Sequence, residues 1–363
     1  MSLVHQIALT LIQKVGHVTA RSLLTRFGTA EAVFSASVQE LLQVEGVGTV
    51  TAGQILRTDA VKVAEEQLKR LQKHQVEPLF YTDQRYPKRL QNCADAPMML
   101  YYRGTANLNH PRIVSVVGTR MATSYGLMLC EQLADTLRPY NVMIVSGLAY
   151  GIDVAIHKQS LLKGIPTVGV LGHGLDRLYP AAHRGTAREM LDKGGLLTEL
   201  PLYTHPDKEN FPQRNRIIAG IADVTIVVEA ALKGGALITA EIANSYNRDV
   251  YAFPGRTTNQ YSEGCNFLIK TNRAGLIMHP RDLIYFMGWE AVADQKPVRQ
   301  TSLALNLSIP ETTIMKVLQS SAYRIDELAI HANIQQSKLA IHLLNLEIKG
   351  LIVTLPGNIY QAV

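Results

Sequence analysis

Residues 113–120 read IVSVVGTR, a run suited to a buried strand, which ends in the turn Gly118-Thr119-Arg120. A helix pattern follows over residues 125–137. A helix that begins just after a strand presents free backbone N–H groups and the positive end of its dipole, and both favour an anion. The arginine adds a permanent charge and a fork of donors that matches phosphate oxygens. This stretch therefore predicts a phosphate site.

Apolar runs of strand length alternate with helix patterns beyond this stretch. The runs span residues 113–118, 142–147, 167–171, 195–200, 225–229 and 250–253. The helix patterns span residues 125–137, 153–163, 183–193 and 237–247. Continuous apolar strands joined by helical crossovers are typical of a parallel sheet covered on both faces. We therefore predict an α/β domain over 112–294, an extended Rossmann-like, doubly wound parallel sheet with ligands at the carboxyl ends of its strands.

Signatures of small cofactors and of catalysis are missing from these strand ends. The Gly172-His173-Gly174 turn lacks the third glycine of a dinucleotide fingerprint, because that position is Arg177, and no Gly-Lys-Ser/Thr occurs. No serine elbow, metal-binding histidine pair or nucleophile–base set is visible. Asp153 and His157 lie one helical turn apart, a spacing at which they could pair. The alternative is that Asp153, at the start of the helix pattern, is its N-cap. We predict no cofactor, no metal and no enzymatic activity.

Composition describes a basic chain with a large core. The 363 residues carry a formal net charge of +6 and 47% are hydrophobic, which favours nucleic acid or another acidic partner. The three cysteines are far apart and form no zinc or disulfide pattern. No cleavable leader and no apolar run of membrane-spanning length is visible, so we expect a cytoplasmic protein without membrane contact.

The N-terminal residues 1–73 show only helical spacing, interrupted by two glycine turns. The turn at 44–48, Val-Glu-Gly-Val-Gly, resembles a helix-hairpin-helix turn, whose amides face a DNA phosphate. The turn at 15–18 matches less well, since His17 and Val18 replace the preferred apolar residue and glycine. A helical bundle without a ligand explains the pattern equally well. Residues 74–111 are a connecting region, with a short strand at 79–82, that belongs to the linker or to the Rossmann-like domain.

The C-terminal residues 308–363 predict a winged helix after a polar linker, 295–307. Helix patterns at 311–318, 325–332 and 335–349 precede a hairpin that turns at Pro356-Gly357-Asn358. The start of the third helix, Gln335-Gln336-Ser337-Lys338, is only lightly basic. This favours protein contact or weak DNA contact over sequence-specific reading.

The central domain resembles the DNA-processing protein A family, also called DprA or Smf. Six blocks carry the resemblance, in the family's order: VVGTR at 116–120, SGLAYGID at 146–153, GHGLDRLYP at 172–180, FPQRNRIIAG at 211–220, EAALKGGALITA at 229–240 and FPG at 253–255. The resemblance implies a Rossmann domain that binds single-stranded DNA, homodimers built through that domain, and loading of a RecA-type recombinase onto the strand in natural transformation.

The resemblance also assigns residues. The phosphate contacts of single-stranded DNA fall on Gly118, Thr119, Arg120, Ser146, Gly147, Arg214, Asn215, Arg216, Gly234 and Gly235. Further DNA contacts are expected at His183, Arg184, Phe211 and Lys233. The triplet Arg214-Asn215-Arg216 is expected just before a helix at 217–222, and either arginine could instead form an internal ion pair. Some relatives place a lysine where this chain has Ala181, whose role passes to His183 or Arg184 or is lost.

Two other functions stay open. The run from Gly234 to Glu241 faintly resembles the glycine-rich motif of nucleotide phosphoribohydrolases, with different spacing. A regulator that binds duplex DNA through the winged helix alone is the third reading.

Overall fold

The computed structural model describes residues 2–57, 59–291, 307–318, 323–349, 351–355 and 359–362. Two compact units make up the chain, Met1–Asp294 and Gln295–Val363, and each is described by itself. The predicted linker at 295–307, except for its last residue, and the predicted turn at 356–358 lie outside the described residues.

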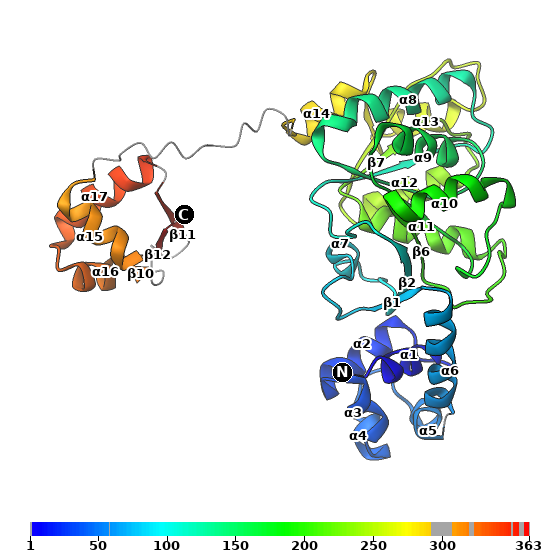
Figure 1. Cartoon of the computed structure of the whole chain (residues 1–363), viewed down its shortest axis with the longest axis horizontal. Helices are drawn as coiled ribbons and strands as arrows, with labels where there is room; N and C mark the ends of the chain where they lie inside the picture. The colour runs from blue at the N-terminus through cyan, green and yellow to red at the C-terminus, as the bar shows by residue number, and fades with distance from the viewer. Residues whose placement is uncertain are drawn as a thin grey trace. The chain divides into compact units, whose positions relative to one another are not determined.

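A nine-stranded sheet organises the first unit, in the order β1-β2-β6-β5-β4-β3-β7-β8-β9 (Figure 1). The strands are β1 (Glu77–Phe80), β2 (Met99–Gly104), β3 (Ile113–Val117), β4 (Met143–Ser146), β5 (Thr167–Val170), β6 (Gly194–Thr198), β7 (Val224–Val227), β8 (Asp249–Ala252) and β9 (Gly275–Leu276). Pairing is parallel from β6 to β9, while β2 pairs antiparallel with β1 and β6. The predicted parallel α/β sheet is confirmed, and β1 and β2 extend it.

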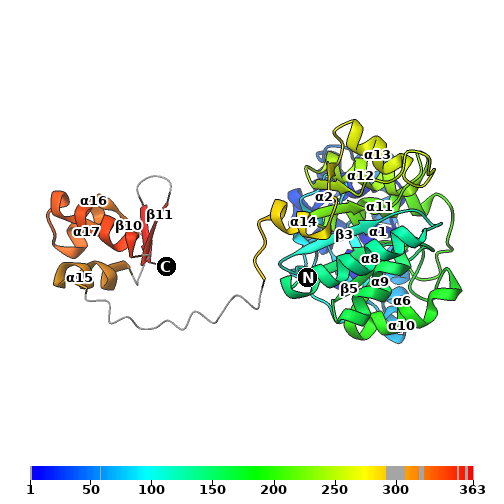
Figure 2. The ribbon, with the colours of Figure 1, turned by 90° about the horizontal axis from the view of Figure 1, so that it is seen from above.

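Helices cover both faces of this sheet (Figure 2). They are α7 (Lys88–Gln91), α8 (Ser124–Leu137), α9 (Ile152–Lys163), α10 (Arg184–Lys193), α11 (Asn210–Ile221), α12 (Gly235–Ser245), α13 (Glu263–Lys270) and α14 (Pro280–Met287). Strand β3 shows why: Ile113 and Val117 pack with α11 and α12, while Val114 and Val116 pack with α8 and α9. Successive side chains of a strand point to opposite faces, so an unbroken apolar run needs a cover on each face.

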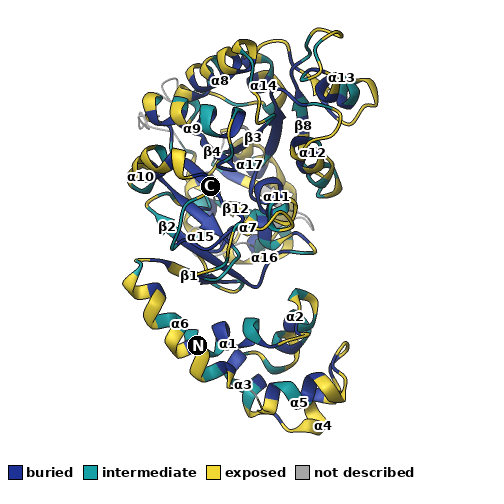
Figure 3. Ribbon diagram, turned by 90° about the vertical axis from the view of Figure 1, so that its right-hand side faces the viewer, coloured by how far each residue is buried: buried dark blue, intermediate teal, exposed yellow. Residues whose placement is uncertain are grey.

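Six helices precede the sheet. They are α1 (Leu3–Leu11), α2 (His17–Phe27), α3 (Ala30–Ser35), α4 (Val38–Leu42), α5 (Thr49–Arg57) and α6 (Ala60–Lys73). Their inner sides are buried and their outer sides are exposed, as Figure 3 shows. Both glycine turns lie between helices, and Gly46 adopts a φ of +82°, a conformation that glycine reaches without strain. The predicted helix-hairpin-helix arrangement is therefore present in the backbone.

The second unit is a winged helix. Its helices are α15 (Ile309–Leu318), α16 (Ile325–Ala332) and α17 (Gln336–Ile348), and β10 (Tyr323–Arg324), β12 (Ile359–Ala362) and β11 (Ile352–Leu355) form a three-stranded sheet in that order. Leu328, Leu339, Leu343 and Ile352 form its separate core. The predicted fold is confirmed, and the two-residue strand β10 was not predicted.

One helix boundary was predicted wrongly. We expected the triplet Arg214-Asn215-Arg216 to precede a helix at 217–222, but α11 begins at Asn210 and contains the whole triplet. Pro212 lies in the first turn of α11, where its missing N–H has no partner to lose, so it does not prevent the helix from beginning at Asn210.

Candidate nucleic-acid interface

A small cavity lies at the carboxyl ends of β3, β4 and β5, the edge where the sheet is expected to bind ligands. The lining residues are Arg120, Leu148, Ala149, Tyr150, Leu171, Gly172, His173, Tyr179, Pro180, Phe211 and Arg214. Its volume is about 40 Å³. Because a water needs roughly 10–15 Å³ of such space, the cavity holds a group the size of a phosphate and not a nucleobase.

Arg120 reaches this cavity from a tightly held turn after β3. The N–H of Thr119 donates to the carbonyl of Glu229 at 2.7 Å, and the carbonyl of Thr119 accepts from the N–H of Ile152 at 3.1 Å. Gly151 has a φ of +78°, and a Cβ there would collide with the turn at Thr119 and Arg120. The guanidinium of Arg120 lies 5.8 Å from the ring centre of Phe211. The turn is rigid while the charged end of Arg120 stays exposed.

Glu229 changes the expectation for the helix that follows the turn. Its carboxylate, on a residue only 1% exposed, accepts from the N–H of Thr123 at 2.9 Å and from its hydroxyl at 2.6 Å. Thr123 is the N-cap of α8, so an internal carboxylate already neutralises this helix end. The strand-turn-helix stretch therefore contributes Arg120 to anion binding more than it contributes the helix terminus.

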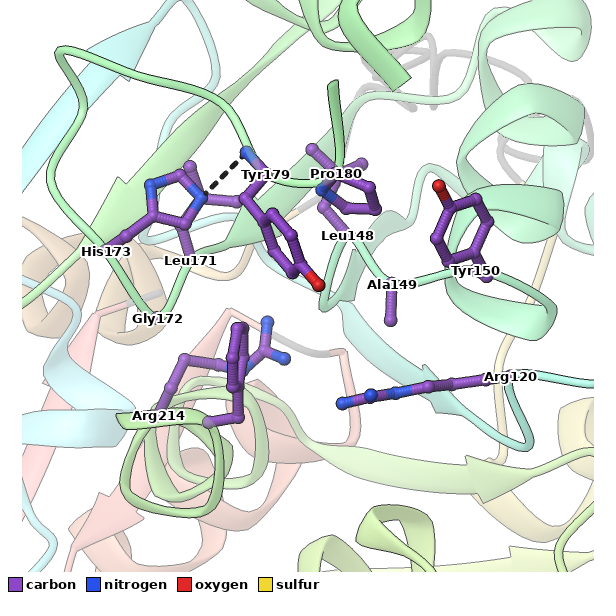
Figure 4. A pocket seen from close by; sticks show the side chains of 11 residues that line it. Arg120, Leu148, Ala149, Tyr150, Leu171, Gly172, His173, Tyr179, Pro180 and Arg214 are labelled. Carbon is purple, nitrogen blue, oxygen red and sulfur yellow. Dashed lines mark hydrogen bonds between the residues drawn. The ribbon is translucent and has the colours of Figure 1, made fainter. Parts of the chain in front are cut away.

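Arg214 reaches the cavity from below the surface. It is 93% buried, donates to the carbonyl of Val170, and has a buried Nε without a hydrogen-bond partner in the described part of the chain. Figure 4 shows its guanidinium and that of Arg120 directed toward the same space. Two guanidiniums with unused donors around a cavity of this size have the chemistry to hold an oxyanion.

A buried acid accompanies Arg214. Burial raises the pKa of Asp153, and the nearby Arg214 guanidinium opposes that rise. Asp153 accepts from the N–H of Ala149 at 3.3 Å. Gly147 lies against both charged groups, since a Cβ there would collide with the Asp153 carboxylate and the Arg214 guanidinium. Asp153 is thus neither the cap of α9, which is Gly151, nor the partner of His157.

The triplet of α11 points in three directions, because successive residues of a helix are turned by about 100°. Arg214 faces the cavity, and Asn215 donates to the carbonyl of Gly235 at 3.2 Å, which joins α11 to the start of α12. Arg216 forms an ion pair with Glu199 and donates to the carbonyl of Asp95. Only the first of the three lines the cavity.

The remaining predicted residues divide by exposure. Ser146 is fully buried and donates to the carbonyl of Val116 at 2.6 Å, and His183 is 5% exposed with its Nδ1 2.9 Å from the carbonyl of Leu148. Ser146 thus ties the end of β4 to β3, and His183 holds the loop after β4 from beneath. The exposed residues are Arg184, Lys233, Gly234 and Gly235, and the partly exposed ones are Gly118, Thr119 and Phe211. Gly234 caps α12, so its helix terminus is open at this same edge.

Two further buried histidines stabilise the loops of the cavity. His157 bonds the hydroxyl of Thr167 and the carbonyl of Gly147, both at 2.6 Å, and burial lowers its pKa to about 4. His173 accepts from the N–H of Tyr179 at 3.2 Å, and burial also lowers its pKa. Both rings are therefore neutral at pH 7 and act as hydrogen-bonding supports.

Sequence reasoning missed Glu229, Tyr150 and Tyr179 as individual site residues. A carboxylate at the end of an apolar strand was a signal for Glu229, because burial requires a partner for it. Nothing in the sequence distinguished the two tyrosines from the other aromatic residues near strand ends.

Family models match all three parts of the chain. The family model described as DNA recombination-mediator protein A matches residues 77–288, a helix-hairpin-helix model matches 7–79, and a DprA winged helix model matches 299–358. The chain is 32% identical to Protein Smf of Synechocystis sp. over 96% of both chains. It is 34% identical to Protein Smf of Escherichia coli, over 75% of this chain and 74% of that one.

Two solved structures are also similar. DNA processing protein A from Streptococcus pneumoniae has a TM-score of 0.68 at 29% identity and covers 80% of this chain and 99% of its own. DNA processing protein A from Helicobacter pylori, described for its single-stranded DNA binding mode, has a TM-score of 0.54 at 29% identity and covers 60% and 98%. With its Rossmann-like sheet, its flanking domains and these matches, the chain belongs to the DNA recombination-mediator protein A family, DprA or Smf.

Proposed function

We propose that this chain binds single-stranded DNA, with Arg120 and Arg214 holding a backbone phosphate at the carboxyl edge of the sheet. The observation that carries the proposal is the convergence of these two guanidiniums, one exposed and one 93% buried, on a cavity of phosphate size. A duplex keeps its phosphates on a stiff rod, whereas a single strand can bend one of them toward the buried Arg214. The Helicobacter pylori relative, named for single-stranded DNA binding, supports the same ligand.

Several phosphates fit this edge better than one mononucleotide. The cavity of about 40 Å³ has no room for a base. Lys233 is exposed next to the open start of α12 at Gly234 and Gly235, so cationic or donor groups continue beyond Arg120. A strand laid across these groups would meet them in succession, and each contact would release counterions.

A competition between single-stranded and duplex oligonucleotides over a salt series tests this. We expect preference for the single strand and a steep fall of affinity with salt. Arg120→Ala should weaken binding and reduce the slope of log K against log[salt] by about 0.7, the contribution of one phosphate contact to a single strand. The matched control is Arg138→Ala, an exposed arginine at the far end of α8. An Arg120→Ala protein with unchanged affinity and slope would contradict the assignment.

We further infer that the bound strand is passed to a RecA-type recombinase in the cytoplasm during natural transformation or recombination. Family membership supports this role. Among the described residues, no helix is both long and apolar enough to cross a lipid bilayer. The test is the rate of recombinase filament formation on single-stranded DNA covered by a single-strand-binding protein, with and without this chain. Equal rates would reject the loading role.

We propose a homodimer through the sheet unit, at its β9 edge. Leu276 on β9, Met278 just after it, and Tyr285 and Phe286 on α14 are exposed, by 43%, 74%, 84% and 51%. β9 has two residues and, within the described part of the chain, pairs with β8 alone, so its outer edge is open there. Exposed apolar side chains beside an open edge are typical of an interface. Met278→Asp should convert a dimer into a monomer in light scattering, and a monomeric parent would reject the interface.

The position of Glu241 argues against the alternative of a nucleotide phosphoribohydrolase. Glu241, the acid of the glycine-rich run, lies on the exposed side of α12 and pairs with Arg273 at 2.5 Å. It does not line the cavity. Incubation with nucleoside monophosphates is the test, and released base would reverse this conclusion.

The winged helix favours a protein partner over duplex DNA. The described exposed side chains of α17 carry one cation and one acid, and three of them are apolar: Gln336, Ser337, Lys338, Ala340, Ile341, Leu344, Asn345 and Glu347. An apolar helix face suits a protein groove better than a major groove lined by phosphates. A mobility assay with residues 307–363, which form their own core, should show no shift of duplex DNA at moderate salt.

A further inference from the structure

Two half-exposed tyrosines border the phosphate cavity. Tyr150 is 51% exposed in the loop after β4, and Tyr179 is 52% exposed in the loop after β5. Figure 4 shows both rings on the opposite side of the cavity from Arg120 and Arg214. The cavity therefore has a cationic wall and an aromatic wall.

The Tyr150 ring is held in place by a buried neighbour. It meets the ring of His183 edge to face, with centroids 4.8 Å apart and planes at 71°. His183 is itself fixed by its 2.9 Å contact with the carbonyl of Leu148, two residues before Tyr150. Gly151, which follows Tyr150, packs against the turn that carries Arg120. The position of the ring is thus coupled to the position of the phosphate-binding arginine.

Another histidine holds the backbone of Tyr179. Its N–H donates to Nε2 of His173, a residue only 1% exposed, at 3.2 Å. Its ring lies 6.1 Å from the ring of Phe211, over which Arg120 stands at 5.8 Å. Two separate loops therefore present a tyrosine at the rim of one cavity, and each uses a buried histidine to do so.

A single exposed tyrosine needs no explanation, since apolar atoms make up much of any protein surface. This pair differs, because immobilising a half-exposed aromatic ring is useful when a planar ligand stacks on it. A nucleotide whose phosphate enters the cavity must keep its base outside, because the cavity lacks the volume for it. The ring faces at the rim are the surfaces that such a base meets. Stacking on aromatic side chains tolerates every base and is unavailable to the paired bases of a duplex.

We propose that Tyr150 and Tyr179 are the base-stacking residues of this site and give it its preference for unpaired DNA. The proposal rests on the proposed function and adds which part of the nucleotide each wall recognises. The arginines bind the phosphate, and the tyrosines stack on the bases.

The test compares the full-length chain with Tyr150→Ala and Tyr179→Ala, by fluorescence anisotropy at moderate salt. One labelled probe is an oligothymidylate, and the second has the same length and phosphates but abasic sites throughout. We expect each alanine variant to bind the oligothymidylate about tenfold more weakly, within the range known for base–aromatic stacking. Affinity for the abasic probe and the salt slope should equal those of the parent. Tyr150→Phe and Tyr179→Phe should bind both probes like the parent, because they keep the ring.

Tyr203→Ala is the matched control. Tyr203 is 47% exposed, but its ring lies beside Arg70 and His74 of the N-terminal helical part, at 5.8 and 6.1 Å, and does not line the cavity. It should leave both affinities unchanged. Equal losses on the thymidylate and abasic probes would show that the tyrosines only shape the loops, and would overturn the proposal. A failure of the DNA-binding proposal looks different: the parent would then bind neither probe, or Arg120→Ala would bind both as tightly as the parent.

Discussion

Arg214 and Asp153 allow a sharp test of the buried half of the site. The variant Arg214→Met keeps much of the side-chain volume but removes the charge. Asp153, 92% buried, then loses the stronger of the two cations that oppose the burial-driven rise of its pKa, and the weaker effect of Arg120 remains. Removing one partner from a buried charged pair typically costs about 3–5 kcal/mol, since the other charge is left uncompensated. We expect the free energy of unfolding at pH 7 to fall by that amount.

The pH dependence identifies the cause. An acid whose folded pKa lies above its unfolded value destabilises the fold progressively as pH rises from the unfolded value, about 3.9, toward the folded one. Removing Arg214 widens this gap, whereas the arginine itself stays protonated throughout the acid range. The deficit of Arg214→Met should therefore be largest at pH 7 and shrink as the pH falls toward 4.

Urea denaturation at pH 7, 5.5 and 4.5 measures this loss in the free energy of unfolding. An unchanged slope m shows that the variant and the parent expose similar surface on unfolding. The matched rescue is Arg214→Met with Asp153→Asn, because asparagine keeps an acceptor for the N–H of Ala149 without the charge. The double variant should recover much of the loss at pH 7 but not DNA binding, which needs the guanidinium. A deficit that is independent of pH, or a double variant no more stable than the single one, would refute the reasoning.

Three further outcomes are expected. Because the pKa of His157 is lowered to about 4 from 6.5, the unfolded chain takes up a proton first as the pH falls, so the free energy of unfolding should fall by about 3 kcal/mol between pH 6.5 and 4. His157→Gln should remove that part of the pH dependence, as measured by denaturation at several pH values. Glu229→Gln replaces a buried, charge-assisted acceptor at the start of α8, so the free energy of unfolding should fall by about 2 kcal/mol, and a variant as stable as the parent in urea would contradict the capping role. Gly147→Ala places a methyl group against Asp153 and Arg214, which should cost about 1–3 kcal/mol and weaken DNA binding, whereas Gly185→Ala, where a Cβ meets nothing within 4 Å, should be harmless in both assays.

The sheet and its edge could be predicted because strand periodicity and chain order determine them. An apolar run such as 113–117, followed by a turn and a helix pattern, is typical of a strand covered on both faces, and parallel strands place their carboxyl ends at one edge. Because Arg120 directly follows such a strand, its place at this edge of the sheet could be predicted from the sequence. Residue positions that follow from the strand pattern were the reliable ones.

Side-chain direction was the part that sequence did not show. Arg214, Asn215 and Arg216 are neighbours in the chain, yet helix α11 turns them toward the cavity, toward Gly235 and toward Glu199. The predicted helix start was wrong, and within α11 Asn215 and Arg216 bond other parts of the protein and do not line the cavity. Ser146 and His183 were expected to contact DNA, but both side chains are buried. Ser146 bonds the carbonyl of Val116, and His183 bonds the carbonyl of Leu148.

The placement of charges at this edge favours a ligand with many phosphates. Glu229 neutralises the start of α8, and Asp153 bonds the N–H of Ala149 within the loop that leads into α9. The anion-binding capacity that strand-to-helix turns normally give to a mononucleotide is thus partly used by the protein itself. The cationic groups available to a ligand include one buried guanidinium, one exposed guanidinium, and the exposed Lys233 beside the open start of α12. The two guanidiniums share one cavity and Lys233 does not line it, so a chain of phosphates can use all three groups while a single nucleotide can use only one or two. A site of this kind gains affinity with every phosphate the strand adds, and its binding should grow with oligonucleotide length until the edge is filled.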